Sequence, residues 1–495
     1  VADKQENEMY ISEIIEMGDK FLAEHEDMFI QRYKSVGPDD YANISYTSGT
    51  TADPKGILLT HRNYTANVEQ VHSVIGIEEN DKMLIILPLD HCFAHVAGFY
   101  TMMSYGASIG TVPSGKNGKE ALRNISPSIM EFQPNVMLSV PTLAKNFKKS
   151  IETAIKKKGA TVEKLYNFAL NNAIAYYKEG YNKGTQFVDI FRWPLVKLFD
   201  KLVFSSVRQG LGGKMKFFVG GGALLDIDLQ KYYNAIGIPM YQGYGLSEAT
   251  PIISANSPQR HIFGSSGKVV SPMEIKILDA DGVEQPYGVK GEICIKGENV
   301  MAGYWKNPKS SPDTVVDGWL HTGDMGYMRD AEMLYVVGRF KSLLIAADGE
   351  KYSPEGIEEN LVESSKYIDG AILHNSQDPY TIVLITPNKD ALKAYAKDLG
   401  LDPTSEEAKV KMLELLQDEV NMYRKGGRLF GAFPERWLPA AVCVLPEPWT
   451  EQNHFLNSSM KVVRGRVEEA YKENMEYAYT PEGKNIVNKM NLASL

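Results

Sequence analysis

A chain of 495 residues is long enough for two or more domains and a large buried core. Its 62 acidic residues outnumber its 53 basic residues, and the net charge of −9 argues against a nucleic-acid-binding protein that relies on a basic surface. The three cysteines lie far apart without a CxxC pair, so the composition predicts neither a disulfide framework nor a zinc site, and it favours a reducing, cytoplasmic setting.

The first 40 residues are predicted to form a helix. Isoleucines, methionine and phenylalanine recur at helical spacing among acidic residues within positions 1–40, and Gly37–Asp40 ends the helix. The opening residues are polar, so no signal peptide is predicted. No apolar run approaches the length of a membrane span.

A stretch rich in hydroxyls and glycines follows, from Tyr46 to Thr60. Asn43–Tyr46 reads as a strand entering a loop and Ile57–Thr60 as a strand leaving it. Glycines let backbone N–H groups approach a ligand and form anion-binding nests, and Lys55 adds a point charge. We therefore predict a loop that wraps phosphate oxygens, although the Walker pattern is absent and a polar hairpin turn is the alternative.

Strands alternating with helices fill the middle of the chain. Segments 82–87, 107–112, 135–140 and 216–219 read as strands between helical segments, and this order predicts mostly parallel sheets. Residues 143–213 are mainly helical and residues 267–297 look all-β. The basic run at 156–158 is interpreted as a solvated face, with a membrane-surface patch as the alternative.

Three polar positions beyond residue 240 have the chemistry of a nucleotide site. Tyr244 offers a flat face for a base, Ser247 a hydroxyl and Glu248 a hard oxygen ligand for Mg²⁺. A carboxylate at Asp324 could accept both hydroxyls of a ribose. The alternatives are a core tyrosine, a solvated glutamate and an aspartate that serves a turn.

The pattern changes near residue 340, where short strands begin to alternate with charged helices. This α+β pattern predicts a separate small core and a domain boundary at that point. A polar loop with one lysine, Lys461, precedes a final helix that begins near Val462.

Taken together, these stretches resemble the adenylate-forming superfamily of acyl-CoA synthetases, luciferases and peptide-synthetase adenylation domains, and most of all the long-chain fatty acyl-CoA synthetases. The resemblance extends from about residue 40 to the end of the chain. The segments that carry it are Leu87–His91, Asp200–Arg208, Phe217–Leu224 and Gln242–Glu248.

The resemblance implies an α/β fold in two parts. Residues 1–340 would form a large ATP- and acyl-binding domain of stacked, mostly parallel sheets with helices and a small β-subdomain. Residues 341–495 would form a small, mobile α+β domain that carries the adenylation lysine. Only about 45 residues precede the phosphate loop, so we expect the front of the large domain, and the natural N-terminus, to lie ahead of Val1.

The resemblance also implies a reaction in two steps with ATP, Mg²⁺ and coenzyme A. A fatty-acid carboxylate attacks the α-phosphorus and releases pyrophosphate, and the coenzyme A thiolate then displaces AMP. Residues expected at the β- and γ-phosphates are Thr47, Ser48, Gly49, Thr50, Thr51 and Lys55. Residues expected along the rest of the nucleotide are Gly221, Gly222, Ala223, Tyr244, Gly245, Asp324 and Arg339.

The resemblance also implies which residues have catalytic roles. Ser247 would touch phosphate, Glu248 would hold Mg²⁺ and His91 would lie beside the substrate carboxylate. Lys461 would bridge the attacking carboxylate and the α-phosphate. Lys341 stands where the family has its hinge, so the small domain would first bring in Lys461 and then present residues near Gly349 to coenzyme A.

Some positions depart from the family pattern, and some alternatives stay open. Ala52 stands where the phosphate loop usually has glycine, Ser247 replaces the commoner threonine, and Ser458 stands where relatives often have proline. Three other interpretations stay open: that the substrate is another carboxylic acid, that the acceptor is a carrier-protein thiol, or that the protein is a non-catalytic nucleotide-binding relative. We expect no nucleic-acid partner. Peripheral contact with the inner face of a membrane would be consistent with a hydrophobic substrate. The sequence gives no oligomeric state and no acyl chain length.

Overall fold

The first long helix precedes a small antiparallel hairpin. The structure, a computed structural model, describes residues 8–47, 55–113, 115, 118–180, 184, 186–307, 311, 314–339, 343–450, 452–456 and 462–495. Helix α1 (Ile11–Ser35) has no buried residue. After it, Gly37–Asp40 turns the chain into strand β1 (Tyr41–Thr47), as the glycine and proline there predicted.

Strands β1 and β2 (Lys55–Thr60) pair antiparallel, and Thr47 lies opposite Lys55. A third strand, β12 (Gly303–Tyr304), pairs with the other edge of β2. The two strands predicted on either side of the phosphate loop are therefore present. The loop residues Ser48, Gly49, Thr50, Thr51 and Ala52 lie outside the described residues, as do Lys341 and Lys461.

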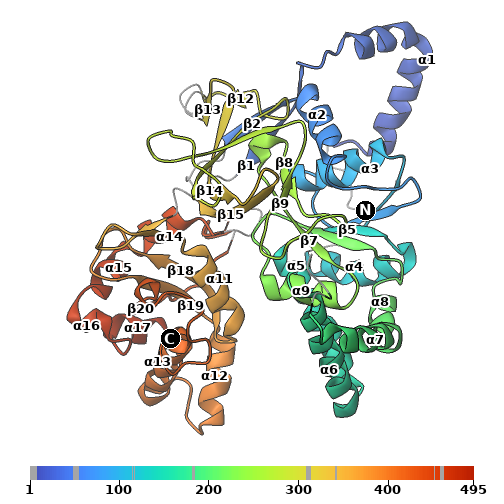
Figure 1. Cartoon of the computed structure of the whole chain (residues 1–495). Helices are drawn as coiled ribbons and strands as arrows, with labels where there is room; N and C mark the ends of the chain where they lie inside the picture. The colour runs from blue at the N-terminus through green and yellow to red at the C-terminus, as the bar shows by residue number, and fades with distance from the viewer. Residues whose placement is uncertain are drawn as a thin grey trace.

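A mixed sheet of twelve strands forms the centre of the large unit (Figure 1). One half is parallel and has the order β4-β3-β5-β6-β7. Its strands are short, and the inner strands β5 and β6 are fully buried, as is typical of parallel strands covered by helices, whereas the edge strand β4 is partly exposed. Their bounds are β3 (Lys82–Ile85), β4 (Ser108–Thr111), β5 (Val136–Ser139), β6 (Phe217–Gly220) and β7 (Met240–Gly245).

The other half of the sheet is antiparallel and corresponds to the region predicted as all-β. It continues from β7 in the order β8-β9-β15-β14-β11-β10, with β13 paired to β14. The mostly parallel order thus applies to one half only. The bounds are β8 (Ile252–Ala255), β9 (Gly267–Val269), β10 (Glu274–Leu278), β11 (Gly291–Lys296), β13 (Val315–Val316), β14 (Trp319–Met328) and β15 (Met333–Arg339).

Helices cover the parallel half and build the largest core cluster with it. Buried Tyr232, Tyr233, Phe204 and Phe218 belong to this cluster. The helices and helical turns of this unit are α2 (His61–Val71), η1 (Phe93–Tyr100), α3 (Thr101–Ser104), α4 (Gly118–Phe132), α5 (Pro141–Lys157), α6 (Ala160–Tyr177), α7 (Asp189–Phe199), η2 (Asp200–Phe204), α8 (Ser205–Gln209) and α9 (Ile227–Ala235). No helix in the described part of the chain has the length and hydropathy needed to cross a membrane.

Elements after residue 343 gather on the orange and red side of Figure 1 and bury two clusters of their own. Lys145 of α5 forms an ion pair with Glu363 of α11 across to this side. The boundary near residue 340 falls outside the described residues and stays a prediction. The bounds are β16 (Leu344–Ile345), β17 (Lys351–Tyr352), α11 (Glu355–Ser364), β18 (Ile368–His374), β19 (Ile382–Pro387), α12 (Lys389–Asp398), α13 (Glu406–Val420), β20 (Ala441–Val444), α14 (Arg464–Ala470), α15 (Lys472–Ala478), α16 (Pro481–Lys484) and α17 (Lys489–Ser494).

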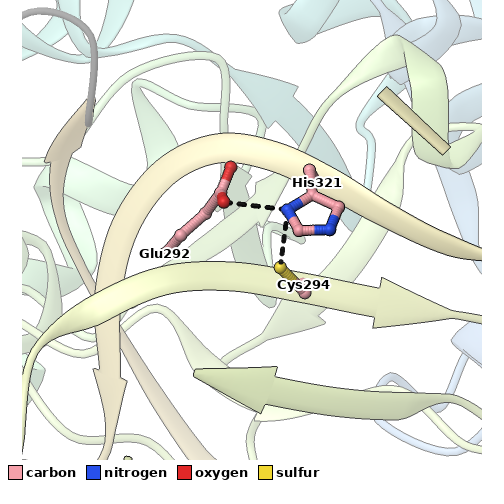
Figure 2. A group of neighbouring side chains, drawn as sticks. All are labelled: Glu292, Cys294 and His321. Carbon is pink, nitrogen blue, oxygen red and sulfur yellow. Dashed lines mark hydrogen bonds and ion pairs between the residues drawn. The ribbon is translucent and has the colours of Figure 1, made fainter. Parts of the chain in front are cut away.

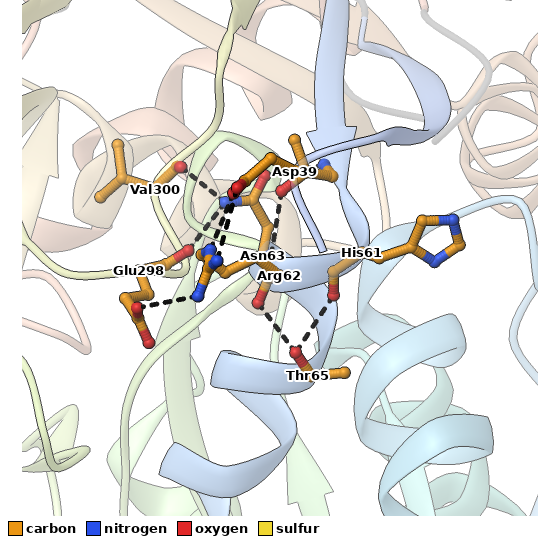
Figure 3. A network of polar contacts seen from close by, with 8 residues as sticks. Asp39, His61, Arg62, Asn63, Thr65, Glu298 and Val300 are labelled. Atoms are coloured by element: carbon orange, nitrogen blue, oxygen red, sulfur yellow. Dashed lines mark hydrogen bonds and ion pairs between the residues drawn. The ribbon is translucent and has the colours of Figure 1, made fainter. Parts of the chain in front are cut away.

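The first turn of α2 anchors a distant segment of the chain (Figure 3). The Asn63 side chain accepts a hydrogen bond from the Thr60 amide and donates to the carbonyls of Glu298 and Val300, at 2.7 and 2.8 Å. Arg62 contacts Asp39 and the Glu298 carboxylate at the surface. This amide therefore fixes the segment that leads into β12.

Replacing Asn63 should cost far more stability than replacing its neighbour. Asn63→Ala leaves two carbonyls without their donor and removes one of the two hydrogen bonds of the capping box with Thr60, so we expect a loss of about 1–3 kcal/mol in the free energy of unfolding. Arg62→Ala removes only exposed ion pairs and should have little effect. Urea unfolding followed by circular dichroism measures both. Equal losses would contradict the assignment of the anchor to Asn63.

Candidate nucleotide site

Glu248 lies in a short 3₁₀ turn, η3 (Ser247–Ala249), at the end of β7. Its Oε1 accepts a hydrogen bond of 2.9 Å from the Tyr304 hydroxyl, and its backbone carbonyl accepts one from the Met301 amide. Tyr304 comes from β12, beside the strand that leaves the phosphate loop. Strand pairing therefore brings the hairpin to the Glu248 turn.

Lys55 makes the same connection from the hairpin side. Its Nζ lies 4.8 Å from the centroid of the Tyr304 ring, a cation–π contact. The other strand of the hairpin, β1, carries Ser45, whose Oγ accepts a hydrogen bond of 3.4 Å from the Cys92 thiol. Cys92 also forms a side-chain hydrogen bond with Ser247. Both ends of the predicted phosphate loop thus lie close to the residues predicted to bind phosphate and Mg²⁺.

The other two charged candidates are neighbours on paired strands. Asp324 of β14 lies opposite Arg339 of β15, and Arg339 Nε is 3.6 Å from Asp324 Oδ1. The Tyr244 hydroxyl donates to Asp324 Oδ2 at 2.7 Å. The charge of Asp324 and that of Arg339 also act on Glu248. We call Tyr244, Glu248, Tyr304, Asp324 and Arg339 the carboxylate cluster.

Burial controls the electrostatics of the carboxylate cluster. Burial raises the pKa of Glu248, while the Tyr304 hydrogen bond and the Arg339 charge lower it and the Asp324 charge raises it. Burial and the neighbouring carboxylate also raise the pKa of Tyr304 and that of Tyr244, so both phenols stay protonated and act as donors. A cation bound between the two carboxylates would relieve their mutual repulsion.

Three of the residues predicted to line the nucleotide, Gly221, Gly222 and Ala223, form a turn beside the side chain of Gln242, a residue to which the sequence analysis gave no role of its own. Buried Gln242 accepts a hydrogen bond from the Leu225 amide at 2.7 Å and donates to the Ala223 carbonyl at 3.3 Å. It holds the turn that contains Gly221, Gly222 and Ala223 beside β7. Gly222 has φ +82°, a backbone conformation that residues other than glycine rarely adopt.

Two further glycines lie where neighbouring atoms leave no room for a side chain, and His91 lies near one of them. A Cβ on Gly221 would lie 2.9 Å from the Phe93 ring, and one on Gly245 would lie 1.9 Å from the Pro251 carbonyl oxygen. His91 is exposed, and its Nδ1 accepts a hydrogen bond from the Phe93 amide at 3.2 Å. The turn with His91 therefore packs against the glycine-rich turn.

A second group of side chains supports the turn that carries Asp324 (Figure 2). Glu292 Oε1 accepts from the Gly323 amide at 3.1 Å, and Oε2 lies 2.9 Å from His321 Nδ1. The Cys294 thiol lies 3.4 Å from the same nitrogen. Among the described residues this is the group whose three donor atoms lie within 4.8 Å of one another, close enough for a metal ion.

The hydrogen bonds of this group favour a positioning role over a metal site. Burial, with the nearby Glu292 charge, raises the pKa of Cys294 to about 12, so the thiolate that a metal prefers is scarce at neutral pH. Glu292 uses both oxygens to fix His321 and the Gly323 amide, next to Asp324. Neither residue was predicted from the sequence, because a Glu in a strand and a His before a turn have no distinctive pattern.

Comparisons with known proteins assign the chain to a family. The profile of the family described as "AMP-binding enzyme" matches residues 2–305. Fatty acyl-CoA synthetase B of Dictyostelium discoideum is 28% identical, with 90% of this chain and 64% of that protein aligned. Long-chain-fatty-acid–CoA ligase 4 of Saccharomyces cerevisiae is 28% identical over 94% of this chain and 65% of its own length. A chloroplastic long-chain-fatty-acid–[acyl-carrier-protein] ligase of Arabidopsis thaliana is 26% identical over 95% and 66%.

Solved structures show the same fold. O-succinylbenzoate coenzyme A synthetase from Bacillus subtilis, in complex with AMP, superposes with a TM-score of 0.58 at 22% identity, over 88% of this chain and 70% of that chain. The anthranilate CoA ligase AuaEII with anthranoyl-AMP gives 0.59 at 20% identity, over 89% and 68%.

The family match covers more than half of the chain, and the superposed structures share its fold. The chain belongs to the family of AMP-binding enzymes, and its curated relatives include long-chain acyl-CoA synthetases. This confirms the resemblance drawn from the sequence. The chain spans slightly less than two thirds of the length of the three curated relatives described above.

Nucleotide binding separates the positioning role of Glu292 from a metal site. Glu292→Ala frees the Gly323 amide and His321, so we expect ATP to bind about tenfold more weakly. Cys294→Ala should leave the affinity within about twofold, because the thiol contributes only a weak contact. Isothermal titration calorimetry measures both. Equal losses, together with about one bound metal ion per chain, would establish a metal site instead.

Proposed function

We propose that this protein activates a long-chain fatty acid with ATP and transfers the acyl group to coenzyme A, releasing AMP and pyrophosphate. The observation that carries this proposal is the contact series from Lys55 through Tyr304 to Glu248. It brings the phosphate-loop strands to the turn predicted to hold Mg²⁺. The names of the curated relatives support the acyl substrate.

The residues of the cluster fit their proposed roles. Asp324 has carboxylate oxygens that can accept ribose hydroxyls, and contacts with Tyr244 and Arg339 keep it oriented. Tyr304 engages one oxygen of Glu248, which leaves the second as a hard ligand of the kind that Mg²⁺ prefers. Mg²⁺, when bound, neutralises charge that develops on phosphate oxygens.

In the first proposed step, a carboxylate oxygen of the acid bonds to the α-phosphorus while the bond to the pyrophosphate oxygen breaks. Lys55 and the loop amides would hold the β- and γ-phosphates, assisted by Ser247, and His91 would lie beside the acid. Lys461 would stabilise the negative charge in line with the attack. Charges that are in place when the attack begins would lower the barrier.

In the second proposed step, the coenzyme A thiolate attacks the acyl carbonyl and AMP leaves with both electrons of the broken bond. A hinge at Lys341 would exchange Lys461 for residues near Gly349 between the steps. We also propose a cytoplasmic location, because the three cysteines are free and buried. Peripheral contact with a membrane belongs to the same proposal.

Pyrophosphate release tests the reaction and the acid together. With ATP and Mg²⁺, we expect release with saturated acids of about 12–18 carbons to exceed that with short or aromatic acids at least tenfold. AMP and acyl-CoA should appear only after coenzyme A is added. An acyl-carrier protein is the alternative acceptor, since one relative bears that name, and supplying it in place of coenzyme A decides between the two. No release with any carboxylic acid would refute the proposal.

The hydrogen bond from Tyr304 should make magnesium dependence sensitive to pH. Because this bond lowers the pKa of Glu248, Tyr304→Phe should raise that pKa further, and a proton would then compete with Mg²⁺ as the pH falls. We expect the Mg²⁺ concentration for half-maximal pyrophosphate release to rise more at about pH 6 than at about pH 8.

The exposed Tyr287 provides the control for this experiment, because Tyr287→Phe makes the same chemical change far from the cluster. Its magnesium dependence should match that of the unaltered protein at both pH values. A Tyr304→Phe effect that is equal at the two pH values would disprove the proton competition.

A further inference from the structure

Helix α7 is apolar on its outer side as well as on its inner side. The stripe begins at Phe187 in the turn before the helix and continues with Phe191, Leu195 and Leu198 of α7 and Leu202 of η2, at spacings of four, four, three and four. All five are exposed, Phe187 by 80% and Phe191 by 66%. The stripe does not belong to the core.

The opposite side of the same helix accounts for its packing. Val196 and Phe199 are buried in the largest core cluster. A helix that is apolar all round is buried in a large protein or faces lipid. The core explains only one side of α7, and the outer stripe needs a different partner.

Positive charge and a tryptophan border the stripe. Lys197 and Lys201 are exposed, and Ile190 and Trp193 continue the apolar surface beside them. We call the five residues of the stripe, with Ile190, Trp193, Lys197 and Lys201, the α7 face. Its composition, large apolar groups with tryptophan and lysine, is that of helices that lie in the interface of an anionic bilayer.

Acidic residues of the same segment do not cancel this charge. Asp189 is buried and pairs with Lys178 at 2.7 Å and with Arg192 at 3.2 Å. Asp200 pairs with Arg208 at 2.6 Å. The negative groups of α7 and η2 are therefore neutralised within the protein, and the lysines set the sign of the outer face.

The neighbouring helix α6 extends the surface. Its exposed Phe168 contacts the Phe199 ring at 5.7 Å, and Leu165 lies one helical turn before it. Exposed Lys164 and the basic run at 156–158 precede α7 in the sequence. In Figure 1, α6 and α7 lie side by side at the end of the large unit away from β12 and β13.

We propose that the α7 face binds the surface of an anionic lipid bilayer, with its aromatic side chains in the interface and its lysines at the headgroups. Contact with a second copy is disfavoured, because a two-fold interface would bring Lys197 and Lys201 of both copies together. The contact lies along the surface, since none of the described helices can cross a membrane. The basic run, interpreted above as a solvated face, would add attraction at longer range.

The α7 face specifies the membrane contact included in the proposed function, and vesicle sedimentation tests it without any catalytic assay, so its failure can be told apart from a failure of the proposed acyl-CoA synthesis. Sucrose-loaded vesicles of phosphatidylcholine, with or without about one third phosphatidylglycerol, are mixed with the protein and pelleted. We expect at least tenfold tighter binding to the anionic vesicles, and weaker binding at high salt.

Two variants and one control locate the surface. Phe191→Ser with Leu198→Ser removes apolar area from exposed positions, so the fold should persist and binding should fall at least tenfold. Lys197→Glu with Lys201→Glu should abolish the preference for anionic lipid. Val283→Ser with Tyr287→Ser changes two equally exposed apolar residues elsewhere and should leave binding within about twofold.

Two results would overturn the proposal. One is equal binding by the α7 double variant and the control, because another surface would then be responsible. The other is no binding to the anionic vesicles, and sedimentation velocity would then show whether the protein forms a dimer that Phe191→Ser with Leu198→Ser dissociates. Such a dimer would assign the α7 face to a second copy of the chain.

Discussion

The hydrogen bond between Tyr304 and Glu248 joins two parts of the protein that the chain makes separately. Tyr304 belongs to the small sheet β1-β2-β12, and Glu248 to the turn that ends β7 of the large sheet. Asn63 holds the segment before β12, and the Met301 amide binds the Glu248 carbonyl. Backbone and side-chain contacts thus fix the same junction, so the phosphate-loop strands and the carboxylate have a defined separation.

The cluster around this junction satisfies a general constraint on buried charge. Burial disfavours the ionised form of Glu248, and the nearby charge of Asp324 disfavours it further. Each carboxylate has a tyrosine hydroxyl as donor, and Arg339 acts on both. Such a set of preorganised dipoles and charges suits a site that must stabilise a nucleotide without large rearrangement.

Sequence patterns predicted the elements better than the contacts between them. Local glycine, proline and hydroxyl patterns were sufficient for β1, β2 and the strand–helix units, because turn chemistry and hydrophobic periodicity are local properties. Tyr304 and Gln242 had no such signal. Tyr304 lies in a turn-rich connector, and its role arises only when β12 pairs with β2. The outer stripe of α7 was missed for a related reason, since an apolar pattern does not say which face is covered.

The half of the sheet beyond β7 shows the same limit. Alternating strands and helices predicted parallel order, and β3 to β7 follow it. Strand β8 then reverses direction, and the antiparallel strands join the same sheet. Composition distinguished the two regions, but only long-range pairing joins them into one sheet.

The raised proton affinity of Glu248 has a consequence for calorimetry. A dication that binds this carboxylate must displace whatever fraction of proton it holds, so complex formation would release that fraction to the buffer. The apparent heat of magnesium–nucleotide association would then change with the ionisation enthalpy of the buffer chosen. Titrations in phosphate and in Tris would differ by an amount that reports how many protons leave the site.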